Sequence, residues 1–251
     1  MTTLIEKRLI KLNINGKETE VEVDPKRTLL DVLREDFDLT GAKKACDHGE
    51  CGSCIVLLGK KGVMACLLPV SRAENKIVTT VESLASHQKN TDDLDPLQRA
   101  FIDCGASQCG YCIPGIIMQS KALLIANPNP TREDVVKYLA RNVCRCTGYV
   151  KIIDAVLQAA SVMRGEEKVL APSGNGNGHI VGHSMDRLDT INEVTGDAKY
   201  AADLKKPGML YAKVLRSPHH HANILKMDVS KAAALPGVEA VITSKDVPGK
   251  I

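Results

Sequence analysis

Nine cysteines in a chain of 251 residues are the feature of this sequence with the clearest chemical meaning. Thiolates bind soft metals, and a reducing compartment disfavours structural disulfides while it favours metal ligation. Eight of the nine fall into two spaced groups. The first group is Cys46, Cys51, Cys54 and Cys66, and the second group is Cys109, Cys112, Cys144 and Cys146. Metal binding is therefore the leading interpretation of both groups.

The first group has the spacing C-x4-C-x2-C with one more cysteine downstream, which is the plant-type ferredoxin pattern for a [2Fe-2S] cluster. Gly49 and Gly52 allow this loop to wrap around a cluster and to aim backbone N–H groups at its sulfur atoms. A structural zinc site is the alternative, but zinc sites usually pair two C-x2-C knuckles rather than a clustered trio and one distant ligand. The spacing therefore predicts a [2Fe-2S] cluster on these four cysteines.

The second group joins C-x2-C to C-x-C across 31 intervening residues. Cys109 and Cys112 precede a helix expected to begin near Pro114, and the positive end of a helix dipole favours thiolates and a negatively charged cluster. Cys144 and Cys146 fall in a turn between two predicted helices, so both pairs can meet at one end of a bundle. The residues alone leave two interpretations open, a second iron–sulfur cluster and a zinc clasp that holds the helices.

Other residues that can ligate metals have plainer interpretations. Cys104 lies in a predicted helical stripe and is expected to be a buried apolar residue rather than a ligand. His219, His220 and His221 are consecutive in a strand-like segment, where successive side chains point to opposite faces. We therefore expect these histidines to be loop or packing residues.

The first group must be positioned by a small α+β domain, predicted over residues 1–85. Alternating apolar residues at 9–14, the turn signal Asn15-Gly16 and the alternation resumed at Val21 and Val23 predict a β-hairpin. Thr28 is expected to cap a helix. Further strands are predicted at 55–58 and 77–81.

A helical domain is predicted over residues 86–164, and three of its helices have start signals. These are an N-cap with a following proline at Asp95-Pro96, a proline start at Pro114, and a capping box of Thr131 with Asp134. A fourth helix is expected from about Lys151. Its buried stripe is predicted at Ile152, Val156, Ala159, Ala160 and Met163. Four short helices predict a small bundle.

The last part of the chain changes character. Charged residues, a proline and a Gly-Asn alternation predict a flexible linker at 165–181. Strand-like stretches follow at 209–215 and 238–243. Since about 70 residues is a marginal length for a lone domain, segment 182–251 is expected to lean on another part of the protein.

Composition excludes some partners. The 33 Lys and Arg residues nearly balance the 30 Asp and Glu residues, and no basic stripe interleaved with aromatics is present to follow a nucleic acid backbone. No apolar run approaches the roughly 20 residues that cross a bilayer. We expect a soluble, cytoplasmic protein without a nucleic acid partner.

Three motifs together resemble the iron–sulfur region of the molybdenum hydroxylase family, which includes xanthine dehydrogenases, aldehyde oxidoreductases and carbon monoxide dehydrogenases. They are CDHGECGSC, QCGYCIPG and CRCTGY. The resemblance implies a ferredoxin-like (β-grasp) domain followed by a four-helix domain. It also implies that the second cysteine group holds the [2Fe-2S] cluster nearest molybdenum and the first group the outer one. Gln108 and Cys146 match positions that approach the pterin of the molybdenum cofactor.

Two later motifs, VTGDAKYAAD and RSPHHHANI, resemble the opening α/β hammerhead-type domain of the family's molybdenum-binding subunit. The predicted linker leads directly into this segment, so no flavin domain is expected in the chain. The sequence departs from the family by stopping at Ile251, where a molybdenum subunit would continue for several hundred residues. The substrate pocket, the catalytic residues and most contacts to the molybdenum cofactor are therefore expected on a separate molybdopterin-binding chain. The sequence alone does not distinguish a natural subunit end at this position from a truncated reading frame.

The resemblance implies an electron-transfer component of an enzyme that oxidises an aldehyde or an N-heterocycle with water-derived oxygen. Electrons are expected to pass from molybdenum through the inner and then the outer cluster to a flavin subunit or a soluble carrier such as ferredoxin or flavodoxin. A stand-alone [2Fe-2S] carrier and a zinc-stapled assembly subunit are the alternatives. The tail from Val194 argues against the first, because a diffusing carrier does not need a partial cofactor-binding domain.

Overall fold

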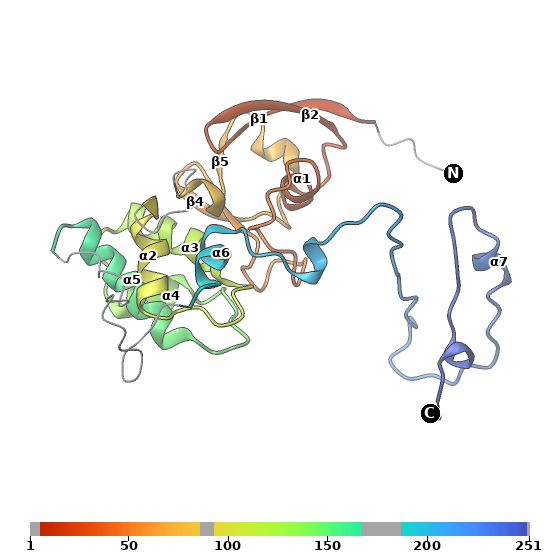
Figure 1. The fold of residues 1–251 in the computed structure, drawn as a ribbon. Coiled ribbons are helices and arrows are strands. Elements are labelled where there is room, and N and C mark those ends of the chain that lie inside the picture. The colour runs from red at the N-terminus through yellow and green to blue at the C-terminus, as the bar shows by residue number, and fades with distance from the viewer. Residues whose placement is uncertain (1–5, 86–92, 167–186, 250–251) are drawn as a thin grey trace. The chain divides into compact units, whose positions relative to one another are not determined.

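The computed structural model describes residues 6–85, 93–166 and 187–249 (Figure 1). The chain divides into two compact units, Met1–Leu204 and Lys205–Ile251. Within the described ranges, no helix combines the length and the apolar character that crossing a membrane requires.

The first unit begins with a five-stranded mixed sheet in the order β2-β1-β5-β3-β4. The strands are β1 (Arg8–Ile14), β2 (Lys17–Val23), β3 (Ile55–Leu58), β4 (Lys61–Met64) and β5 (Ile77–Thr79). The predicted hairpin is confirmed, because β1 pairs antiparallel with β2 and both turn residues, Asn15 and Gly16, have positive φ (55° and 82°). β5 ends two residues earlier than predicted, and a 3₁₀ turn at Val81–Ser83 follows it.

One face of this sheet is covered by α1 (Leu29–Glu35). Ile10, Leu12 and Ile14 alternate along β1 and are buried against the apolar face of α1. Thr28 caps the helix as predicted, since its Oγ1 accepts a hydrogen bond from Asp31 N at 3.1 Å. The domain therefore has the ferredoxin-like α+β fold expected from the sequence.

Four helices follow in residues 93–166. They are α2 (Pro96–Asp103), α3 (Ile113–Ala126), α4 (Arg132–Tyr138) and α5 (Tyr149–Met163). The predicted capping box of Thr131 with Asp134 is present, and the predicted N-cap residue Asp95 also forms a capping box, with Gln98. The predicted stripe of α5 is buried except for Met163, which is 46% exposed. Met163 is the last residue of its helix, where neighbouring elements cover a side chain less completely.

Strand β3 packs on one side against the helices and on the other side against α1, and all four of its residues are apolar. Ile55 and Leu57 belong to the core of the helical part, while Val56 belongs to the core under α1. Both faces of β3 are therefore covered, which explains its unbroken apolar sequence. The loop that precedes β3 contains three cysteines of the first group and so lies where the two cores meet.

Gly115 in α3 marks a tight contact between the helical part and this cysteine loop. A Cβ at Gly115 would lie 2.3 Å from Gly52 O and 2.9 Å from Ser53 Cα. Because both are backbone atoms, Gly115→Ala is expected to lower the free energy of unfolding by about 1–3 kcal/mol, measured by denaturant titration. Gly62→Ala is the matched control, since its Cβ would meet the movable end of the Gln119 side chain at 2.3 Å. Equal losses in the two variants would contradict this account.

The described part of the second unit, 205–249, contains α7 (Ser230–Ala233) and a 3₁₀ turn at Ser244–Asp246, with irregular structure between them. The strands predicted at 209–215 and 238–243 are wrong for this structure. A strand is stable only when neighbours pair its backbone and cover one face, and most side chains in these two stretches are exposed. The predicted linker 165–181 lies almost entirely outside the described residues.

Candidate metal centres

The β3–β4 hairpin brings the first cysteine group together. Ala65 N donates to Cys54 O (3.3 Å), so the hairpin places Cys66 beside Cys54, and the two thiols contact each other. Cys46 and Cys51, in the loop before β3, form a second contacting pair. Cys54 and Cys66 are buried, while Cys46 and Cys51 are half-buried. The four predicted ligands therefore lie in one place, as two pairs.

The loop backbone stabilises negative charge at the outer pair. Gly49 and Gly52 have positive φ (82° and 70°), and Glu50 N and Cys51 N each lie 3.4 Å from Cys46 Sγ. Burial opposes ionisation, but the backbone N–H groups around Cys46 outweigh it and lower the pKa of this thiol to about 6. Burial raises the pKa of Cys54 to about 12. Without a metal, Cys54 therefore stays protonated at neutral pH.

The second cysteine group gathers at one end of the helical part. Cys109 and Cys112 precede α3, and Cys112 is its N-cap residue. The thiol of Cys112 contacts that of Cys144, and the thiol of Cys109 contacts that of Cys146. Burial raises the pKa of Cys112 above its ordinary value. As in the first group, the structure brings all four predicted ligands together in two pairs.

The donor sets fit iron–sulfur clusters. Each site offers four thiols, the ligands that [2Fe-2S] clusters use. A cluster spans two irons, so its ligands surround it as pairs rather than meeting at one point. Within the described ranges, no three or more His, Cys, Asp or Glu side chains form a group that fits a single metal ion.

The two cysteine loops contact each other through hydrogen bonds from residues 141–143, which belong to none of the cysteine motifs. Val143 N donates to Cys51 O at 2.9 Å, and Arg141 Nη2 donates to Gly49 O at 2.9 Å. Asn142 Nδ2 donates to Gly52 O at 3.3 Å. Their position directly before Cys144 was the only signal available in the sequence. These hydrogen bonds hold the loop of one group against the loop of the other.

Gln108 and Cys146, the predicted pterin contacts, are neighbours, because Gln108 Nε2 donates to Cys146 O at 3.3 Å.

Cys104 differs from its prediction, since it is half-buried at the C-cap of α2 and its Sγ donates to Gln158 Oε1 at 2.9 Å. A thiol at a helix end can reach such a partner more readily than one in the middle of the apolar stripe. The three consecutive histidines are exposed and lie in a bend rather than in a strand.

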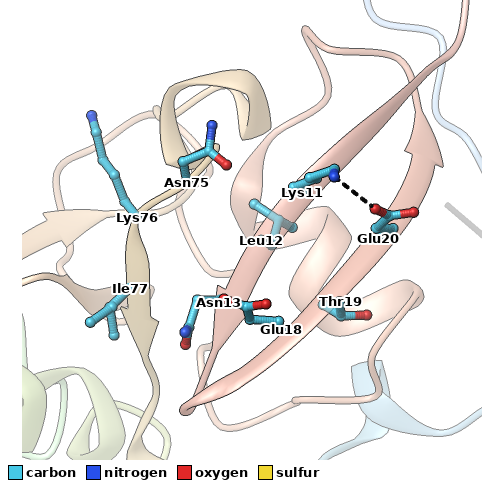
Figure 2. Close-up of a pocket in the computed structure, with 9 residues that line it drawn as sticks. All are labelled: Lys11, Leu12, Asn13, Glu18, Thr19, Glu20, Asn75, Lys76 and Ile77. Carbon is cyan, nitrogen blue, oxygen red and sulfur yellow. Dashed lines mark ion pairs between the residues drawn. The ribbon is translucent and has the colours of Figure 1, made fainter.

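A pocket of about 500 Å³ lies elsewhere on the ferredoxin-like domain (Figure 2). Residues of β1, β2 and the segment entering β5 line it, and Lys11 pairs with Glu20 at its edge (3.4 Å). None of the predicted cysteine ligands lines this pocket, so it is separate from both cysteine sites.

Three family models match the chain. Residues 12–77 match the 2Fe-2S iron-sulfur cluster binding domain, and residues 80–157 match the [2Fe-2S] binding domain. Residues 195–251 match the aldehyde oxidase and xanthine dehydrogenase a/b hammerhead domain. A ferredoxin-like domain and a helical domain, each with four gathered cysteines, define the class of proteins that carry two [2Fe-2S] clusters.

Relatives identify the family. The chain is 43% identical over 155 residues to the nicotinate dehydrogenase small FeS subunit of Eubacterium barkeri, covering 62% of this chain and 96% of that one. It is 41% identical over 247 residues to the aldehyde oxidoreductase of Megalodesulfovibrio gigas, covering 95% of this chain but 27% of the relative. The crystal structure of the aldehyde oxidoreductase from Desulfovibrio desulfuricans ATCC 27774 matches with a TM-score of 0.85 and 41% identity, over 96% of this chain and 27% of that chain. The chain belongs to the molybdenum hydroxylase family, as an iron–sulfur part fused to the first domain of a molybdopterin-binding part.

Proposed function

We propose that the chain is the electron-transfer part of a molybdenum hydroxylase. In this proposal the first cysteine group holds the outer [2Fe-2S] cluster and the second group holds the inner one. The observation that carries the proposal is the gathering of eight cysteines into two sites, each composed of two contacting thiol pairs. The spacing of the first group and the two matching [2Fe-2S] family models support the same assignment.

When bound, such clusters supply one-electron redox chemistry. The chain's own residues fix their positions and tune their potentials. Backbone N–H groups beside Cys46 stabilise negative charge on the outer site, and the buried thiols of Cys54 and Cys112 exclude water from one side of each site. The hydrogen bond from Val143 N to Cys51 O holds the two sites next to each other. This arrangement suits a relay rather than two independent centres.

The molybdenum cofactor is proposed to lie outside residues 1–251, on a molybdopterin-binding partner or part, with Gln108 and Cys146 facing its pterin. Relatives described as small FeS subunits support such a partner.

A flavin subunit or a soluble carrier is the proposed electron acceptor. Since relatives are called aldehyde oxidoreductase and nicotinate dehydrogenase, the proposed substrate is an aldehyde or an N-heterocycle. The chain spans only 27% of the length of the aldehyde oxidoreductase relative, so the whole enzyme's activity is part of the proposal.

Metal analysis of the anaerobically purified full chain tests the cluster assignment. We expect about four irons and about four acid-labile sulfides per chain, and a paramagnetic signal after reduction with dithionite. Stoichiometric zinc, or a colourless sample without a signal after reduction, would refute it. Purification from the native source then separates the relay from a stand-alone carrier, because the relay is expected to bring a molybdenum-containing polypeptide with it.

A further inference from the structure

Residues 187–203, here called the clasp, lie against both cysteine loops within the first unit. The clasp contains α6 (Thr190–Thr195), which packs beside α2 and α3 (Figure 1). The hammerhead family model begins at residue 195, yet residues up to Leu204 belong to the compact unit that carries the cysteines. The clasp therefore makes its contacts within the iron–sulfur part of the chain, although its last residues match the hammerhead domain.

Asp203 anchors the clasp to the ferredoxin-like domain. Its side chain is 1% exposed, and its two oxygens lie 2.5 Å from Arg34 Nη2 and 3.1 Å from Lys43 Nζ. The backbone N–H of Tyr200 also donates to Asp203 Oδ2, at 3.0 Å. Lys43 is equally buried and precedes Cys46 by only three residues. The clasp thus supplies the carboxylate that neutralises a buried amine beside the outer cysteine site.

Tyr200 connects the two cysteine loops. Its hydroxyl donates to Cys109 O at 2.7 Å, and Lys43 Nζ lies 4.7 Å from the centre of its ring. Its ring also packs edge-on against Tyr111, with centroids 5.0 Å apart. The Tyr111 hydroxyl in turn donates to Lys44 O at 2.9 Å. Tyr200 therefore contacts residues that border each of the two sites.

The first part of the clasp holds the loop that leads into the second cysteine group. Ser107 Oγ donates to the buried Glu193 at 2.5 Å, and Arg187 Nη1 donates to Ser107 O and Gln108 O at 3.0 and 2.8 Å. Gly110 has φ +77°, and a Cβ there would lie 2.5 Å from Glu193 and 2.6 Å from Tyr200 Oη. The packing is close enough that a shift of the clasp would move this loop.

We propose that the clasp sets the position of the inner cluster site relative to the outer one, with Tyr200 and Asp203 as positioning residues for electron transfer between them. The inference rests on the proposed function. It adds that Tyr200 and Asp203, which lie in the part of the clasp matched by the hammerhead family model, act on the electron relay. Asp203 acts through Lys43 and Arg34, and Tyr200 acts through the carbonyl group of Cys109 and the ring of Tyr111.

The test uses the full chain with its clusters in five variants, one of which, Asp203→Glu, keeps the carboxylate. Tyr200→Phe removes only the hydroxyl that binds Cys109 O. Asp203→Asn keeps the size of the side chain but removes the charge and replaces one of the two acceptor oxygens by an NH2 donor. Tyr211→Phe and Asp228→Asn are the matched controls, because both residues are exposed and lie in the second unit. For each variant, iron and sulfide are counted, the reduction potential of each cluster is titrated, and the magnetic interaction between the two reduced clusters is measured by electron paramagnetic resonance.

We expect Tyr200→Phe to keep its iron and sulfide while the inter-cluster splitting changes and the inner cluster's potential shifts more than the outer one's. Asp203→Asn is expected to change the inter-cluster splitting and the inner cluster's potential more than Tyr200→Phe does. Asp203→Glu keeps the carboxylate, so its splitting and potentials are expected to stay closer to those of the parent protein. Parent-like splitting and potentials in both Tyr200→Phe and Asp203→Asn would overturn the proposal. If Asp203→Asn loses its clusters, Tyr200→Phe alone decides. A parent chain without iron and sulfide would instead refute the proposed function.

Discussion

Cys112→Ser is expected to remove about half of the iron and sulfide that the chain binds, leaving about two of each. Cys112 is 8% exposed, caps α3 and contacts the Cys144 thiol, so the substitution takes one ligand from the inner site only. A serine hydroxyl is a poor ligand for iron in this setting, because it is harder and less acidic than a thiol. Iron and sulfide analysis together with the reduced paramagnetic spectrum measures the loss, and the remaining signal is expected to be that of the outer cluster.

Cys104→Ser is the control for this prediction. Cys104 belongs to the same helical part, but it lies outside both cysteine groups, and its Sγ donates to Gln158 Oε1. A serine hydroxyl can donate to the same oxygen, so full iron and sulfide contents are expected. Unchanged iron in Cys112→Ser, or an equal loss in Cys104→Ser, would show that the second group does not hold a cluster in the way proposed.

Asp203→Asn is expected to lower the free energy of unfolding by about 3–5 kcal/mol, because it leaves the charges of Arg34 and Lys43 buried without their anion. The side chains of Asp203 and Lys43 are each 1% exposed, so water cannot replace the lost carboxylate. Denaturant titration of the full chain provides the measurement. Asp154→Asn breaks an exposed ion pair with Arg132, in which both side chains are about half exposed, and is expected to cost roughly 0.2–1 kcal/mol at most. Similar losses in the two variants would contradict the buried ion cluster.

The effect of Asp203 depends on pH in a defined direction. Burial alone raises the pKa of Asp203, but hydrogen bonds from Arg34, Tyr200 N and Lys43 outweigh it and hold the pKa below its ordinary value. A carboxylate whose pKa is lower in the folded state stabilises the fold above its unfolded pKa, which is about 3.9. The difference in unfolding free energy between parent and Asp203→Asn is therefore expected to be complete above about pH 4 and to shrink as the pH falls through the lowered pKa.

Local features of this protein were predictable from the sequence because the interactions that define them span a few residues. The Asn15-Gly16 turn, the N-caps at Thr28 and Asp95 and the capping box at Thr131 each depend on hydrogen bonds or backbone preferences within a single turn. The spacing of the cysteines likewise belongs to the sequence itself. It predicted which thiols gather, although their role as cluster ligands stays a prediction.

The tertiary structure alone decided how the two cysteine loops are held together. The hydrogen bond from Val143 to Cys51 and the ion pairs of Asp203 with Arg34 and Lys43 join residues about 90 to 170 positions apart, and no local pattern encodes such contacts. The same limit explains the strands wrongly predicted at 209–215 and 238–243, because alternation describes a tendency that only a paired and covered strand can realise. The order of the residues was enough to set the chemistry of the thiols and the local turns and caps around them. Packing between distant segments decided the rest, since it depends on where the whole chain places each buried charge and each loop.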